Sequence, residues 1–207
     1  PFSSNGLSDC LRLESRAINR DVKNSTGSRR NAVKHGLGMS MFIYRGGPGG
    51  TAEASVALNQ QGIYEVSVGI MDVGEGSGTV LLQMASEVLK TDPENVSLRI
   101  GNTATTPKAG LTAGSTVTFS SGLAVKDAAM GLKRTLLLEA ANLMGEGLSS
   151  LSLVGNNVES TSGQSISLSH IASAAGEIKI NGKVVPGSSD YIVNSFGAHF
   201  VELEVDV

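Results

Sequence analysis

The sequence predicts an α+β fold, with helices packed on one side of small mixed or antiparallel sheets. Three observations predict this class. Alternating apolar residues mark a β-hairpin across residues 54–68, segments 79–90 and 116–144 have helical apolar periodicity, and residues 197–207 alternate again as a strand. The order of these elements predicts two units that each run strand, strand, helix, strand.

The first part of the chain reads as a helix, a linker and a strand. Leucine and isoleucine recur with helical spacing across residues 7–18, and a polar linker with Ser and Gly follows at 24–30. Residues 35–47 have the composition of a strand, and the sequence GPGG after it is typical of a turn or loop. In the hairpin, residues 59–62 form the turn between two alternating runs.

The most regular helical pattern follows the hairpin, where Val80, Met84 and Val88 repeat every four residues. The sequence DPEN ends this helix, and the chain returns as a strand at 96–101. A polar loop then leads into the longest predicted helix, residues 116–144, with its apolar residues mostly on one face.

The remaining residues predict a second and looser unit with a short helix at 168–174 and the closing strand. We therefore expect three regions. The first is an N-terminal helix with its polar linker at 1–30, the second is the main unit at 31–145, and the third is an incomplete α+β unit at 146–207.

Composition limits the possible classes of protein. The chain has 207 residues, 40% of them hydrophobic, which is enough for a sizeable core. No apolar run approaches the roughly 18 residues of a membrane span, and no signal-peptide pattern is present, so the cytoplasm is the expected location. The single cysteine, Cys10, excludes an internal disulfide and is expected on a helix face.

Charge and histidine spacing argue against two kinds of site. A net charge of −3 and an aromatic content of 4% do not suit a nucleic-acid surface, and the short basic cluster at 29–35 is expected to be a solvated loop. The three histidines, His35, His170 and His199, are too far apart in sequence for the short ligand spacings of a metal site.

A glycine-rich stretch, residues 74–78, stands directly before the helix at 79–90. A helix N-terminus offers free N–H groups and partial positive charge, and glycines let an anion or a flat ring approach the backbone. A dinucleotide fingerprint would need glycine where Thr79 stands, and no P-loop Lys-Ser/Thr follows. A tight turn before the helix explains the glycines equally well.

A longer set of motifs resembles the molybdenum-cofactor-binding large subunit of the xanthine dehydrogenase and aldehyde oxidase family. In order, these motifs are Gly74-Glu75-Gly76, Gln83-Met84-Ala85, Asn102-Thr103 with Pro107, and Thr112-Ala113-Gly114-Ser115. The flanks agree, because "HGLGMSMF" and "SFGAHFVELEVDV" are similar to strands of that family. Several motifs in the right order over about eighty residues are more specific than one glycine box.

The resemblance implies which residues bind a molybdenum-molybdopterin cofactor, with or without an attached nucleotide. Val73, Gly74, Glu75 and Gly76 would lie against the pterin, while Gly114, Ser115 and Thr116 would contact its phosphate or dithiolene side. Glu75 stands where the family has glutamine, and an ionised carboxylate cannot donate a hydrogen bond. The unit at 31–145 would then be the cofactor-binding one.

The resemblance also implies the activity of an intact enzyme, which is hydroxylation of an aldehyde or an N-heterocycle with water as the oxygen source. Its catalytic glutamate has no counterpart here and is expected beyond Val207, so the chain is expected to be an inactive fragment of the molybdenum subunit. Partners would be the rest of that subunit, iron–sulfur and flavin (FAD) domains or subunits, and a small-molecule substrate. Two alternatives remain: a different enzyme with a nucleotide at residues 74–78, and a degenerate homologue acting as a scaffold or assembly module.

Overall fold

The computed structural model describes residues 1–19, 33–185, 187 and 190–206. The expected linker at 24–30, two arginines of the basic cluster (Arg29 and Arg30) and Val207 lie outside these residues. Contacts divide the chain into two compact units, one made of Pro1–Gly47 with Ser188–Val207 and one made of Pro48–Gly187. Within the described residues, no helix combines the length and the apolar content that crossing a membrane requires.

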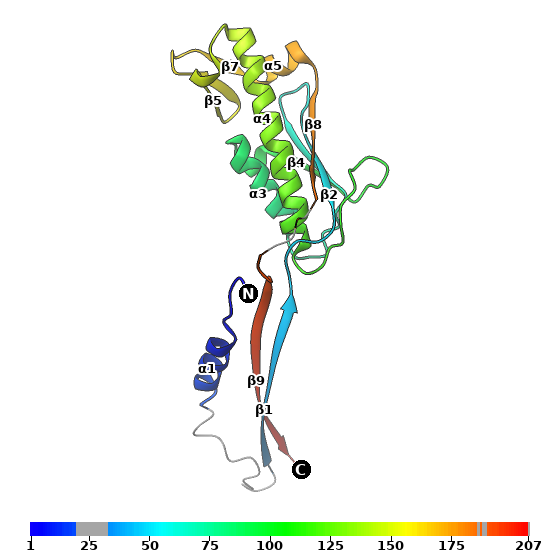
Figure 1. Cartoon of the computed structure of the whole chain (residues 1–207), viewed down its shortest axis with the longest axis vertical. Helices are drawn as coiled ribbons and strands as arrows, with labels where there is room; N and C mark the ends of the chain where they lie inside the picture. Colours follow the sequence, from blue (N-terminus) through cyan, green and yellow to red (C-terminus); the bar gives the residue numbers. More distant parts are fainter. Residues whose placement is uncertain (20–32, 186, 188–189, 207) are drawn as a thin grey trace. The chain divides into compact units, whose positions relative to one another are not determined.

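The first unit is a long two-stranded ribbon with one helix. Strand β1 (Val33–Arg45) pairs antiparallel with β9 (Asn194–Asp206) along its whole length, and helix α1 (Leu7–Ala17) packs on β9 (Figure 1). The Cys10 thiol is half-buried on α1 and lies 3.9 Å from the carbonyl oxygen of Phe196. The expected N-terminal helix, both strands and the helix-face position of the cysteine are confirmed.

The second unit is built on a four-stranded sheet in the order β4-β3-β2-β8. Its strands are β2 (Ala52–Leu58), β3 (Tyr64–Val68), β4 (Val96–Ile100) and β8 (Ile178–Val184). Strands β2 and β3 form the expected hairpin, and β4 lies parallel to β3. Asn59 closes the hairpin, since its side-chain oxygen accepts the N–H groups of Gln61 and Ile63 at 2.9 Å each.

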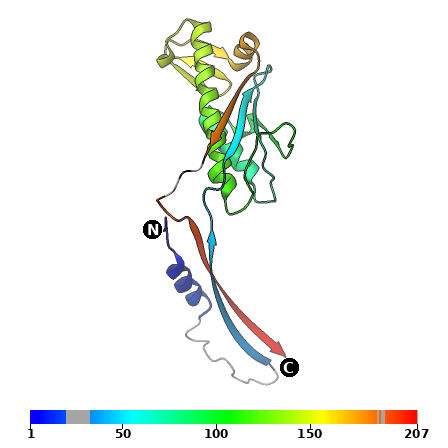
Figure 2. The same ribbon diagram turned by 45° about the vertical axis from the view of Figure 1, so that its right-hand side comes forward.

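Two helices cover one face of this sheet (Figures 1 and 2). Helix α3 (Ser77–Leu89) packs on β3 and β4, and the longer α4 (Gly122–Met144) packs on β2, β8 and α3. The repeat Val80, Met84 and Val88 that predicted α3 is half-buried, and the row of apolar residues beside it is the fully buried face. Fully buried side chains on the two helices include Leu81, Ala85, Leu89, Ala124, Ala128, Leu132 and Leu136.

A smaller sheet lies near the C-terminal end of α4 (Figure 2). It has three antiparallel strands, β5 (Leu151–Val154), β6 (Asn157–Ser160) and β7 (Ser165–Ser167), and is followed by helix α5 (Leu168–Ala175). Short helical turns, η1 (Pro93–Asn95) and η3 (Leu148–Ser150), precede β4 and β5. The α+β class expected from the sequence is confirmed.

The arrangement of the second half differs from the expected repeat of strand, strand, helix, strand. The strand after α5, β8, does not close a sheet of its own but pairs with β2 along seven residues. The division at 145/146 therefore falls inside the second compact unit. The physical reason is long-range strand pairing, which local alternation does not encode.

The contact between β8 and α4 is unusually close at one glycine. A Cβ atom added to Gly182 would lie 2.2 Å from the carbonyl oxygen of Ala124 and 2.6 Å from the backbone nitrogen of Ala128. Small residues on both sides thus bring the backbone of the helix directly onto the strand.

Substitution of Gly182 tests this contact. Gly182→Ala is expected to lower the free energy of unfolding by about 1–3 kcal/mol, because the backbone of α4 must shift to admit the methyl group. Urea unfolding followed by circular dichroism measures the change. Gly50→Ala is the control, since Gly50 is exposed and a Cβ there meets no atom within 4 Å. Equal stability of the two variants would contradict the close contact.

Candidate functional site

The loop before α3 is held in shape by an aspartate. The Asp72 carboxylate accepts the N–H of Gly74 at 2.8 Å and the N–H of Gly78 at 3.2 Å. These bonds hold the pKa of Asp72 below its ordinary value. Gly74 and Gly76 have φ angles of +101° and +77°, which explains the glycines at these two positions. Asp72 therefore caps α3 from outside the helix.

Glu75 turns back onto the same loop. Its carboxylate accepts the N–H of Val73 at 2.8 Å. The neighbouring Ser77 hydroxyl and the backbone N–H groups of Glu75 and Val73 hold the pKa of Glu75 below its ordinary value. The Ser77 hydroxyl itself is buried and lies beside this carboxylate without reaching the geometry of a hydrogen bond. The loop thus presents an ionised, hydrogen-bond-accepting side chain near neutral pH.

A second segment, Thr112–Thr118, leads into the long helix. Gly114 and Ser115 both have positive φ angles, +57° and +64°, and the Thr116 N–H donates to the carbonyl oxygen of Ala113 at 3.0 Å. The helix then opens with a π-helical turn, η2 (Val117–Ser121), before α4. Positive φ at a serine is uncommon, and π-helical turns occur frequently at functional sites.

The two segments meet and line one cavity of about 410 Å³. The Thr112 hydroxyl joins them by donating to the carbonyl oxygen of Met71 at 3.0 Å. Both segments lie at helix N-termini, where backbone N–H groups without intrahelical acceptors favour negative charge. The lining residues are Val73, Glu75, Ser77, Val80, Thr112, Ala113, Gly114, Ser115, Thr116, Val117 and Thr118.

The structure brings together the residues that the resemblance singled out. Val73 and Glu75 line the cavity from one side, and Gly114, Ser115 and Thr116 line it from the other. Gly74 and Gly76 do not line the cavity and instead shape the backbone of the first loop.

Sequence reasoning did not select Asp72, Ser77, Thr112 or Thr118 as functional residues. Asp72 could have been found from its place before a glycine-rich helix entrance, where a capping carboxylate is favoured. Ser77 and Thr118 carry no distinctive spacing, and only their burial or position in the cavity reveals them.

The residues present fit a flat, polar, anionic cofactor. The side at 112–118 has hydroxyl groups and no charged side chain, and it lies at a helix N-terminus, which suits an anionic group. Ser77 adds a buried hydroxyl without a partner at the wall of the cavity. The side with Glu75 is negative and suits N–H donors of a ring rather than a phosphate.

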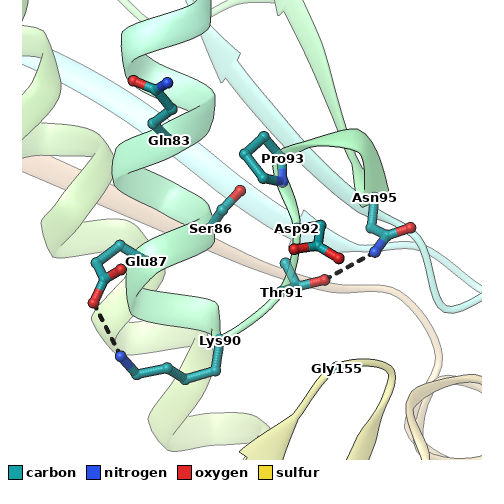
Figure 3. Close-up of a pocket in the computed structure, with 9 residues that line it drawn as sticks. All are labelled: Gln83, Ser86, Glu87, Lys90, Thr91, Asp92, Pro93, Asn95 and Gly155. Carbon is teal, nitrogen blue, oxygen red and sulfur yellow. Dashed lines mark hydrogen bonds and ion pairs between the residues drawn. The ribbon is translucent and has the colours of Figure 1, made fainter.

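A larger cavity of about 630 Å³ lies at the other end of α3, near the turn at Gly155 (Figure 3). Its side chains already bond to one another, with Lys90 Nζ 3.0 Å from Glu87 Oε1 and the Asn95 amide donating to the Thr91 hydroxyl at 3.3 Å. Asp92 and the C-terminal end of the helix make this region unfavourable for an anion. None of the expected site residues lines it.

Sequence comparison finds a protein family and several relatives that match this chain. The sequence profile of the molybdopterin cofactor-binding domain matches residues 12–207. Human aldehyde oxidase is 31% identical over 132 residues, which cover 62% of this chain and 10% of that protein. A probable hypoxanthine oxidase of Escherichia coli K12, XdhD, is 30% identical over 179 residues, which cover 83% of this chain and 18% of that protein.

Solved structures show the same fold. Quinoline 2-oxidoreductase from Pseudomonas putida 86 superposes with a TM-score of 0.71 at 18% identity, covering 97% of this chain and 28% of that one. The aldehyde oxidoreductase of Desulfovibrio gigas superposes with a TM-score of 0.70 at 22% identity, covering 99% of this chain and 22% of that one.

These matches span less than a third of the length of each relative, and they cover between 62% and 99% of this chain. The profile match, the relatives and the fold agree with the motifs at 74–76 and 112–115. From these observations, the chain belongs to the molybdopterin cofactor-binding domain family of the aldehyde oxidase and xanthine dehydrogenase type.

Proposed function

We propose that this chain binds the molybdopterin form of the molybdenum cofactor in the cavity between residues 73–77 and 112–118. The observation that carries the proposal is the meeting of two segments, distant in sequence, at one cavity between two helix N-termini. A dinucleotide fold or P-loop would need only the first segment and a different glycine spacing.

Each side of the cavity has its own role in this proposal. Val73 would lie against the flat pterin, Gly74 and Gly76 would give the loop the backbone shape that brings Val73 there, and Glu75 would accept N–H donors of the ring. Gly114, Ser115 and Thr116 would border the phosphate near the start of the long helix, and the Ser115 hydroxyl with the N–H groups of Gly114 and Ser115 would donate to it. The side at 112–118 suits both plain molybdopterin and its dinucleotide form, because both carry phosphate.

The whole protein would be an oxidoreductase that hydroxylates an aldehyde or an N-heterocycle with water as the oxygen source. The cofactor, when bound, supplies the two-electron chemistry, and this chain orients it and keeps its anionic end fixed. The residues described here would not supply the catalytic base. Iron–sulfur and FAD domains or subunits would accept the electrons. The alternative, a non-catalytic homologue that acts as a scaffold or assembly module, would contain no metal.

The molybdenum content of the natural gene product tests the proposal. The protein would be purified from its own host with its partner subunits, and the molybdenum-to-protein ratio would be measured by elemental mass spectrometry. A ratio near one supports the cofactor site. A ratio near zero in the folded, fully assembled protein would favour the non-catalytic scaffold.

Replacement of Glu75 tests the role of its charge. Glu75→Gln keeps an acceptor for the Val73 N–H and removes a negative charge beside an anionic cofactor. Cofactor binding is therefore expected to be unchanged or tighter by up to about fivefold, because a repulsive charge is removed. Molybdenum content and the fluorescence of the released, oxidised pterin measure it. Weaker binding would show that the carboxylate itself holds the cofactor.

Two serines of α3 offer a matched test of the cavity wall. Ser77 and Ser86 are both buried without a hydrogen-bond partner, but only Ser77 lines the candidate site. Ser77→Ala is expected to weaken cofactor retention by roughly three- to tenfold, the value of one hydrogen bond. Ser86→Ala should leave it unchanged. Equal effects of the two substitutions on pterin content would remove Ser77 from the site.

The cap formed by Asp72 predicts a dependence of stability on pH. The folded-state pKa of Asp72 is lowered, so its stabilising effect is complete above the unfolded value of about 3.9 and is lost as pH falls through the folded value. Asp72→Asn should therefore be less stable than the parent at pH 7, with the difference shrinking below about pH 4. Urea unfolding at several pH values measures it. A difference that is constant with pH would contradict the charged cap.

A further inference from the structure

An apolar groove with a basic rim lies between the C-terminal half of α3 and the middle of α4. Its volume is about 480 Å³. The apolar residues that line it are Val88, Met130, Leu137 and Leu148, and the charged ones are Glu87, Lys90, Lys133 and Arg134. None of these residues lines the cavity at 73–118, so the groove is separate from the cofactor site.

The charge of the groove is opposite to that of the chain. Glu87 is its one carboxylate and pairs with Lys90 at 3.0 Å (Figure 3). Lys133 and Arg134 form no ion pair within the part of the chain that the structure describes. Two uncompensated cations therefore border an apolar surface in a protein whose net charge is −3.

The groove is open rather than enclosed. Met130 is 56% exposed and Leu148 is 42% exposed. Small-molecule sites usually bury most of their ligand, which an open groove cannot do. Met130, Lys133, Arg134 and Leu137 also follow the spacing of one helix face, so the apolar and basic groups form a stripe along α4. A helix lying along such a stripe can cover it.

We propose that this groove binds an acidic amphipathic helix of a partner polypeptide. The apolar side of that helix would pack on Met130, Leu137 and Leu148, and its carboxylates would pair with Lys133 and Arg134. Methionine suits such a surface because its side chain adapts to the shape of the partner. An anionic membrane is the weaker occupant, since the negative charge of the whole chain opposes it.

A labelled synthetic peptide tests the proposal with the 207-residue chain. The probe is a helical peptide of about 15 residues, long enough to form a helix, with leucines at positions i, i+3, i+7 and i+10 and glutamates beside them. A second peptide has lysine in place of every glutamate. Fluorescence anisotropy is expected to show binding of the acidic peptide at least tenfold tighter than that of the basic one.

Variants locate the binding. Lys133→Glu combined with Arg134→Glu should weaken binding of the acidic peptide at least tenfold, and Met130→Glu should weaken it independently. Lys126→Glu combined with Lys179→Glu is the control, because both lysines are exposed and outside the groove. This control should change the affinity less than twofold. Melting temperatures and circular dichroism establish that the variants are folded.

Three results would overturn the proposal. Equal binding of the acidic and basic peptides would mean apolar contact without charge recognition. Equal affinity of the groove variant and the control would place the peptide elsewhere. Tighter binding to phosphatidylserine vesicles than to the acidic peptide, lost in the Lys133 and Arg134 variant, would identify the groove as a membrane contact.

Discussion

The close packing of α4 on strands β2 and β8 is the contact on which the second unit depends. Gly182 and Ala128 let helix and strand approach until their backbones touch, and Gly131 leaves room on the helix for the side chain of Ile180. Strand β8 comes after all the other elements of this unit in the sequence. By pairing with β2, it brings residues 178–184 next to residues 52–58 and so joins the end of the unit to its beginning. The π-helical turn η2, whose residues Val117 and Thr118 line the candidate cavity, leads directly into this packed helix.

The candidate cavity lies between two helix N-termini with different side-chain chemistry. Glu75 lines one side, and both Glu75 and Asp72 accept backbone N–H groups of their own loop. The other side, Thr112–Thr118, carries hydroxyl groups without charge and has positive φ angles at Gly114 and Ser115. An anionic ligand therefore has one favourable orientation in this cavity, with its negative end toward the long helix. Because of this difference in charge, the motifs at 74–76 and 112–115 have different roles, although both contain glycine and both precede a helix.

Helix α3 separates two surfaces with different physical character. Its N-terminus lies at the cofactor cavity, and its C-terminal residues border both the polar cavity near Gly155 and the apolar groove with Lys133 and Arg134. A helix of 13 residues spans about 20 Å, which separates the candidate cavity from the groove on one rigid element. The Glu87–Lys90 pair lies between the polar cavity and the groove, and Lys133 and Arg134 have no ion-pair partner among the residues that the structure describes.

Sequence patterns predict the local elements and the chemistry of the loops. Apolar alternation and helical periodicity between nearby residues are enough to predict the hairpin at 54–68, the helices and the α+β class, and the family motifs can be recognised from their order. Three features are visible only in the folded structure: β8 pairs with β2, β1 pairs with β9 although more than a hundred residues separate them, and Ser77 and Thr118 line the same cavity. Each depends on contacts between residues far apart in the chain, and apolar periodicity cannot predict such contacts because it describes one segment at a time.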